Sequence, residues 1–187
     1  MKKKVLICVV AVVLVLCCAV GGTIAWLTAT TEPVVNIFTV GDINIDLSES
    51  ENLNLKMVPG NTIAKDPKVT VLEGSEKCYL FVKLEKSGNF DSFLTCEIAD
   101  GWTPLDGVDN VYYRTVEASD AAQEFQVLAG NEVTVLGTVT KEMMNALTEP
   151  TYPKLTVTAY ASQFNKNAAE PFTVNEAWTN ISGTSGT

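Results

Sequence analysis

The chain has 187 residues, of which 47% are hydrophobic and 19% are charged, and its 22 acidic residues outnumber its 13 basic residues. This surplus of acids disfavours binding to nucleic acid or to anionic membrane surfaces, because no basic patch offsets the repulsion. The chain contains no histidine. It therefore lacks the usual ligands of a catalytic zinc ion and the base of serine or cysteine nucleophile systems. We expect no enzyme activity, no cofactor and no metal.

The N-terminal segment predicts export. Three lysines are followed by sixteen apolar residues, 5–20, which fits the core of a signal peptide and is short for a membrane span. Small residues indicate a cleavage region at Ala25, Trp26 and Leu27. We expect residues 1–26 to be removed, with contact to the membrane only before cleavage, and the rest to be secreted. The uncharged stretch reaches Leu27 and is long enough to span a bilayer, so an uncleaved anchor is the alternative.

The secreted part is predicted to be a single domain with two flexible ends. Residues 27–35 are polar and β-branched and indicate an extended N-terminal arm, whereas residues 182–187 form a polar tail. Residues 36–181 are long enough for one domain with its own core. Because three of the 13 bases lie in the leader, the secreted part has 22 acids against 10 bases, a net charge of −12.

Short runs of alternating apolar and polar residues follow one another along this domain. Residues 36–47 place Ile43, Ile45 and Leu47 on one face of a strand. Further strands are predicted from Leu53, around Val69 and Val71, and at 77–86, 93–98, 111–116, 125–128, 132–139 and 154–164. Turns at 59–61, 87–89 and 129–131 separate several of these runs.

Helical patterns are few. Thr140 is predicted to cap a short helix at 141–147, with Met143, Met144 and Leu147 on its apolar side. A helical turn at 173–181 is expected to dock Trp178, and residues 117–124 are expected to be a loop with one helical turn. About ten strands without crossover helices predict an all-β fold, an antiparallel two-sheet β-sandwich.

Two cysteines, Cys78 and Cys96, lie outside the leader. They fall in two consecutive strand-like runs, which adjacent antiparallel strands would bring together, so a disulfide between them is one expectation for an oxidising exterior. Two half-buried thiols are the alternative, because the sequence does not give the separation of the Cα atoms.

Other side-chain patterns point to structure more than to chemistry. Asp42-x-Asn44-x-Asp46 begins like a calcium loop, but Leu47 and Leu53 replace the required glycine and glutamate. We expect these side chains to line the solvent face of a strand. A looser calcium site among acids of the 100–110 loop stays open. Four aromatic residues suggest a sugar platform, although their bulk favours the core: Trp102, Tyr112, Tyr113 and Tyr160.

Three stretches resemble the TasA and camelysin-like proteins of Gram-positive bacteria: 21–27 (GGTIAWL), 36–47 (NIFTVGDINIDL) and 57–66 (MVPGNTIAKD). The likeness is specific over roughly residues 1–70 and continues only as a pattern beyond them. It implies an alternate signal peptide processed by a SipW-type signal peptidase, a jelly-roll-like β-sandwich, and an extracellular or biofilm-matrix role.

The resemblance leads to two functional hypotheses. The first is a structural protein that assembles with copies of itself into fibres by strand addition, with a donor strand that contains Thr28, Val34, Val35, Ile37 and Phe38. The second is a surface-exposed module that binds a protein or a glycan through the 100–110 and 117–124 loops. A camelysin-type metalloprotease is a distant third, disfavoured by the absence of histidine.

Overall fold

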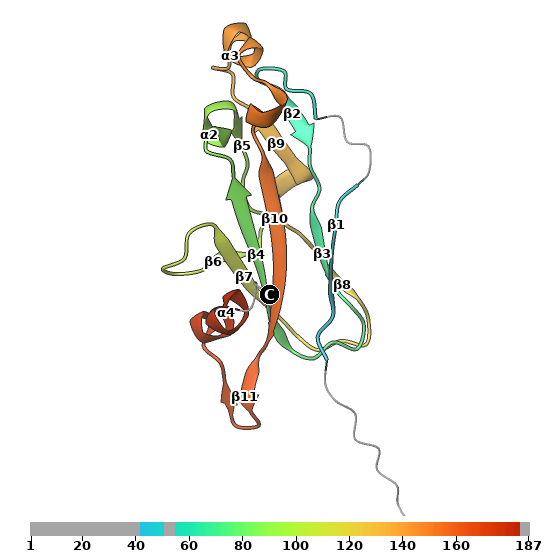
Figure 1. The fold of residues 1–187 in the computed structure, drawn as a ribbon. Coiled ribbons are helices and arrows are strands. Elements are labelled where there is room, and N and C mark those ends of the chain that lie inside the picture. The colour runs from blue at the N-terminus through green and yellow to red at the C-terminus, as the bar shows by residue number, and fades with distance from the viewer. Residues whose placement is uncertain (1–41, 51–54, 184–187) are drawn as a thin grey trace, which may run out of the picture. The chain divides into compact units, whose positions relative to one another are not determined.

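The structure is a computed structural model that describes residues 42–50 and 55–183. The predicted signal peptide, the arm and the boundary at residue 36 lie outside the described residues, and those assignments stay predictions. The described part of the chain contains four antiparallel sheets and only short helices (Figure 1). This arrangement confirms the predicted all-β, antiparallel fold class.

The largest sheet has the strand order β10-β4-β7-β6. Its centre is β4 (Cys78–Lys86), which pairs along its length with β10 (Leu155–Gln163) and also with β7 (Val111–Val116). The short β6 (Thr103–Pro104) forms the far edge. The structure confirms the strand predicted at 77–86 and places it between β10 and β7.

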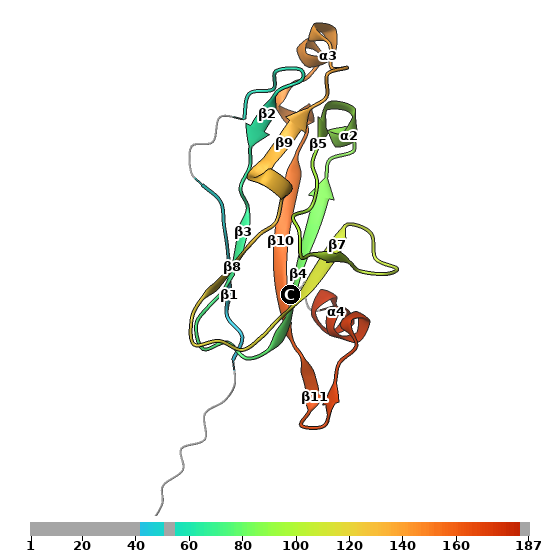
Figure 2. The same ribbon diagram turned by 180° about the vertical axis from the view of Figure 1, so that it is seen from behind.

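Two three-stranded sheets and one hairpin complete the fold. One sheet has the order β1-β3-β8, formed by Ile45–Ser48, Lys68–Val71 and Gln123–Gln126. The other has the order β2-β9-β5, formed by Thr62–Ala64, Glu132–Val135 and Leu94–Thr95. The hairpin pairs β11 (Asn165–Asn167) with β12 (Glu170–Pro171). Figure 2 shows β2, β9 and β5 beyond one end of β3 and β8.

The main core lies on one face of the four-stranded sheet. Cys78, Leu80, Val82 and Leu84 of β4 belong to one buried cluster with side chains of both three-stranded sheets, such as Val69 and Val133. Because three sheets bury their apolar faces in the same cluster, they are arranged as the layers of a sandwich. Each fully buried aliphatic side chain contributes roughly 1.5–3 kcal/mol relative to exposure.

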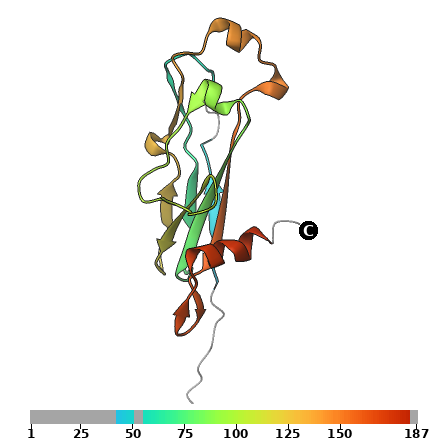
Figure 3. The same ribbon diagram turned by 90° about the vertical axis from the view of Figure 1, so that its left-hand side faces the viewer.

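The opposite face of that sheet is covered by the C-terminal helix. Phe81 of β4 packs with Ala177 and Trp178 of α4 (Val174–Ser182), and the Phe81 and Trp178 ring centroids are 5.3 Å apart. Figure 3 shows α4 lying across the strands. The helix starts with a capping box in which Thr173 and Glu176 bond each other's backbone N–H. The predicted docking of Trp178 is confirmed.

The other helices are single turns. Thr140 caps α3 (Lys141–Asn145) by accepting a 3.2 Å hydrogen bond from the Met143 N–H, as predicted. Two 3-10 turns lie at Ala129–Asn131 and Glu149–Thr151. No helix of the described residues is both long and apolar enough to cross a membrane.

Several local predictions were wrong. The predicted strand 93–98 is only partly present, as the two-residue β5 and an isolated bridge at Ile98, and its first residue ends the short helix α2 (Phe90–Phe93). Residues 55–58 form no strand, and β2 was not predicted. The 117–124 segment has no helical turn, because the Ser119 hydroxyl closes a local turn with the N–H and C=O of Ala121.

Candidate functional site

The long strand β10 ends the four-stranded sheet with an open edge. No described strand pairs with the side of β10 that faces away from β4. Its sequence, LTVTAYASQ, contains no charged residue and no proline. Proteins usually protect a sheet edge of this length with lysines, prolines or bulges, because its free N–H and C=O groups accept another strand. Among the described residues, the outer edge of β10 therefore carries backbone groups that no other strand pairs with, although β1 and α4 lie close to this strand.

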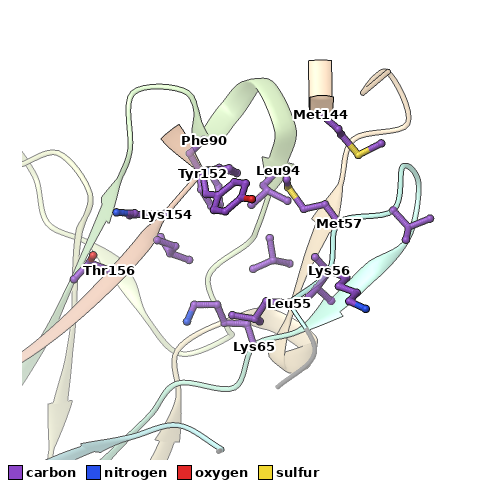
Figure 4. A pocket seen from close by; sticks show the side chains of 15 residues that line it. Leu55, Lys56, Met57, Lys65, Phe90, Leu94, Met144, Tyr152, Lys154 and Thr156 are labelled. Carbon is purple, nitrogen blue, oxygen red and sulfur yellow. The ribbon is translucent and has the colours of Figure 1, made fainter. Parts of the chain in front are cut away.

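An apolar pocket opens beside the first residues of this strand. It has a volume of about 850 Å³, and its apolar lining comes from several elements that are distant in sequence (Figure 4). The lining residues include Ile63 of β2, Val133 of β9, Leu94 of β5 and Leu155 of β10. A pocket of this volume is within the range of binding sites for small ligands or for a few apolar side chains of a partner.

Local structure explains how the sequence shapes this pocket. Gly60 takes a positive φ of 79° in the turn before β2, and its N–H bonds the carbonyl of Val135. That conformation favours glycine, and the turn is closed by a 3.0 Å hydrogen bond from the Asn61 N–H to the carbonyl of Val58, which lines the pocket. On the other side, the capping pair Thr148 and Thr151 orders the turn that places Tyr152 over the pocket (Figure 4).

The pocket has exposed apolar walls. Five large hydrophobic residues of the described chain are exposed, and three of them line this pocket: Leu55 at 58%, Tyr152 at 50% and Val58 at 49%. Exposed apolar side chains that gather around one cavity indicate a binding surface, whereas single ones are ordinary. The sequence analysis did not identify these residues as a binding surface, and it placed Leu55 in a predicted strand that begins at Leu53.

The charged residues that line the pocket are all lysines: Lys56, Lys65 and Lys154. Lys65 forms an ion pair with Glu49, with Nζ 2.8 Å from Oε1. No Asp or Glu is among the lining residues that the structure describes. Residues 27–187 have a net charge of −12, so these lysines form a locally basic rim around an apolar centre. Such a rim suits an occupant that is apolar with an acidic group.

The sequence-predicted site residues have different outcomes. The cleavage residues Ala25, Trp26 and Leu27 lie outside the described residues, as do Thr28, Val34, Val35, Ile37 and Phe38 of the proposed donor strand. The four aromatic residues form no sugar platform. Trp102 is buried and donates its indole N–H to the Gln126 carbonyl at 2.8 Å, Tyr112 packs on the main core, and Tyr113 and Tyr160 pack on the cluster under α4.

The expected disulfide between Cys78 and Cys96 is corrected by the structure, in which both thiols are free. Cys78 begins β4, whereas Cys96 follows β5 in a different sheet. Cys96 lies within electrostatic reach of Lys86, at the opposite end of β4. Eight residues of strand separate Cys78 from Lys86, about 26 Å at the usual rise, which is far beyond the Cα separation of a disulfide.

The described part of the chain contains no group of side chains that fits a metal ion. No three side chains of the Cys, Asp, Glu or His type gather there in a group able to hold an ion. Asp42 instead accepts hydrogen bonds from the Ile43 N–H and the Asn44 amide in the segment before β1, so the predicted strand does not include residues 42–44 and begins only at Ile45. A histidine-based zinc centre also lacks its ligands, because the sequence contains no histidine.

The comparison with protein families gives one finding. Residues 1–78 match the family described as camelysin metallo-endopeptidase, which confirms the resemblance stated from the 21–27, 36–47 and 57–66 stretches. No curated protein and no solved structure matches the chain significantly.

Proposed function

From the premise that residues 1–78 are of the camelysin and TasA-like type, we propose that this chain is an exported, non-catalytic structural protein of the cell surface or extracellular matrix. Its N-terminal segment is removed by a SipW-type signal peptidase, and the mature domain assembles with copies of itself into fibres. The arm of one copy, around Val34, Val35, Ile37 and Phe38, adds as a strand to the next copy.

The observation that carries this proposal is the uncharged open edge of β10 next to the apolar pocket. Strand addition needs free backbone groups for affinity and apolar pockets for alternate side chains of the incoming strand. The edge supplies the former and the cavity lined by Ile63, Val133 and Leu155 supplies the latter. The β-branched arm has the matching composition, and its Glu32 provides an acid for the lysine rim.

The family description names a metallo-endopeptidase, and this is the competing function. The residues of this chain do not support it, because a zinc peptidase of the usual kind takes two histidines and a glutamate base from one helix. We therefore keep peptidase activity as the alternative to be measured, with casein as the substrate and added zinc.

The test is deletion of residues 27–35 from the mature protein. We expect a folded monomer, with an unchanged unfolding midpoint, that forms no fibres under the electron microscope. A synthetic peptide of residues 27–41 should then bind this monomer. Fibres of normal length from the deleted chain would refute the donor role.

Two double variants test whether assembly depends on the apolar side chains of the arm and not only on the length of the arm. Val34→Asp with Val35→Asp should abolish fibres, because two carboxylates cannot enter an apolar pocket without a large desolvation cost. Thr30→Asp with Thr31→Asp introduces the same charge in the same arm and should leave assembly intact. Equal effects of the two pairs would show that charge alone, and not pocket filling, controls assembly.

A further inference from the structure

The only arginine of the chain lies between two layers of the fold. Arg114 lies on the same face of β7 as Tyr112 and Val116, whose side chains pack on the main core. Its guanidinium carbon is 4.0 Å from the ring centroid of Phe125 and 5.2 Å from that of Trp102. A cation held against two aromatic rings has a fixed position and orientation.

This guanidinium has no partner of opposite charge. It forms no ion pair and no hydrogen bond with any of the described residues. Burial lowers the pKa of Arg114, and no carboxylate counteracts that effect. Arginine carries five N–H donors, and a partly buried charge normally has them satisfied by acceptors. The described protein supplies none, so the donors face the adjoining cavity.

The cavity at Arg114 is polar and distinct from the pocket beside β10. Its volume is about 460 Å³, and its lining includes Asp100, Glu124 and Gln126. Glu124 also pairs with Lys68 at 3.0 Å. Gly101 leaves the space that the guanidinium occupies, because a Cβ there would lie 2.7 Å from Nη2. Asp100 and Glu124 come from the 100–110 and 117–124 loops predicted to bind a partner.

We propose that this cavity binds a sugar that carries a carboxylate, with Arg114 as the carboxylate receptor. The planar fork of arginine matches the two oxygens of a carboxylate and forms two parallel charge-assisted hydrogen bonds. Asp100, Glu124 and the Gln126 amide accept hydrogen bonds from ring hydroxyls. The same two acids offer no hydrogen-bond donor to a bare inorganic anion, so the lining favours a ligand that brings several hydroxyl donors together with its carboxylate.

The proposal is independent of fibre assembly, because it uses β7 and β8 and not the edge of β10. It predicts a specific ligand class. The probe is a tetramer of galacturonic acid, titrated into the purified monomer by isothermal calorimetry at low salt. We expect binding that weakens with added sodium chloride, and at least about tenfold weaker binding of a neutral galactose tetramer.

Variants of Arg114 and a matched control complete the test. Arg114→Gln should weaken binding at least about tenfold, and Arg114→Lys, which keeps the charge and loses the fork, should be intermediate. Lys83→Gln removes the same charge from the same sheet and should bind like the wild type. Thermal unfolding of each variant verifies folding.

Three results would overturn the assignment. The first is no binding of the galacturonate tetramer to the folded wild type. The second is equal binding by Arg114→Gln and Lys83→Gln. The third is binding of tetraglutamate as tight as that of the sugar, which would make the site a receptor for acidic peptides.

Discussion

At the scale of single residues, Glu176 is the acid with the most protein partners near the C-terminus. Its carboxylate accepts from the Thr173 N–H and hydroxyl at 2.8 Å and pairs with Lys166 at 2.7 Å. The Lys166 pairing and then these Thr173 hydrogen bonds lower the pKa of Glu176 from 4.5 to about 2. The carboxylate therefore stays ionised at pH values where a free glutamate is protonated.

This shift predicts a pH dependence. Because the folded pKa lies below the unfolded one, the stabilisation is complete above pH 4.5 and is lost as the pH falls toward 2. Between those values the wild-type unfolding midpoint should fall more than that of Glu176→Gln. The measurement is thermal unfolding by circular dichroism from pH 7 to pH 2.5. Glu149→Gln, at an exposed turn, should keep the wild-type pH profile, and the same profile for both variants would contradict the prediction.

The two cysteines allow a second residue-scale prediction. Burial raises the pKa of Cys78 to about 11 and also raises that of Cys96, and Cys78 is fully buried whereas Cys96 is partly exposed. Iodoacetamide at pH 8 should therefore modify Cys96 faster than Cys78 in the native protein, with both reactions slow. After denaturation without reductant, mass spectrometry should show two modified thiols in the mature protein. If neither thiol were modified in the denatured protein, Cys78 and Cys96 would be joined by a disulfide, which would contradict the structure.

At the scale of elements, β4 organises both sides of the fold. Its alternating side chains enter the main core on one face and the cluster under α4 on the other. Leu80 is fully buried, so Leu80→Ala should cost about 3 kcal/mol of unfolding free energy, through lost transfer energy and the cavity left behind. Leu72→Ala changes the same atoms at a site that is 40% exposed and should cost less than about 1 kcal/mol. Urea unfolding measures both, and similar costs would contradict the assigned burial.

The elements that were predictable share a simple property. The 77–86, 111–116 and 154–164 runs have long alternation and pair over many residues, so the local pattern and the tertiary contacts agree. The Thr140 cap was predictable because its hydrogen bond is local. β5 was not predictable, because a strand of two residues that pairs with β9 is too short to show an alternation of apolar and polar residues. The helical turn Phe90–Phe93 comes directly before it. Of the two alternatives for Cys78 and Cys96, the structure shows the free thiols, and the sequence could not decide between them because it does not give the separation of the Cα atoms.

At the scale of the whole molecule, the apolar pocket could not be predicted from the sequence. The pocket gathers Leu55, Ile63, Leu94, Val133 and Leu155, which lie across a hundred residues and carry no shared motif. The sequence analysis came closer to the Arg114 cavity, because it named the 100–110 and 117–124 loops as a possible binding surface. The arginine itself was missed, because the sequence of a strand does not show whether an acidic side chain will pair with its arginine in the folded protein.

Assembly through the apolar pocket makes a whole-molecule prediction. Leu55→Ser with Val58→Ser alters two pocket residues that are 58% and 49% exposed, so the monomer should lose less than about 1 kcal/mol of stability. Fibre formation should nevertheless fall strongly, because the incoming apolar strand loses its contact surface. Light scattering measures the rate and electron microscopy the fibres.

The control is Leu72→Ser, which removes an exposed leucine outside the pocket and should assemble normally. Salt provides an orthogonal test. Copies with a net charge of −12 repel one another, so raising sodium chloride from 10 to about 150 mM should accelerate wild-type assembly by shortening the screening length to about 8 Å. If the pocket is the docking surface, this acceleration should be much smaller for the Leu55/Val58 variant, because screening removes repulsion without supplying the missing apolar contact. Full recovery of fibres by salt alone would instead place the attractive surface elsewhere on the molecule.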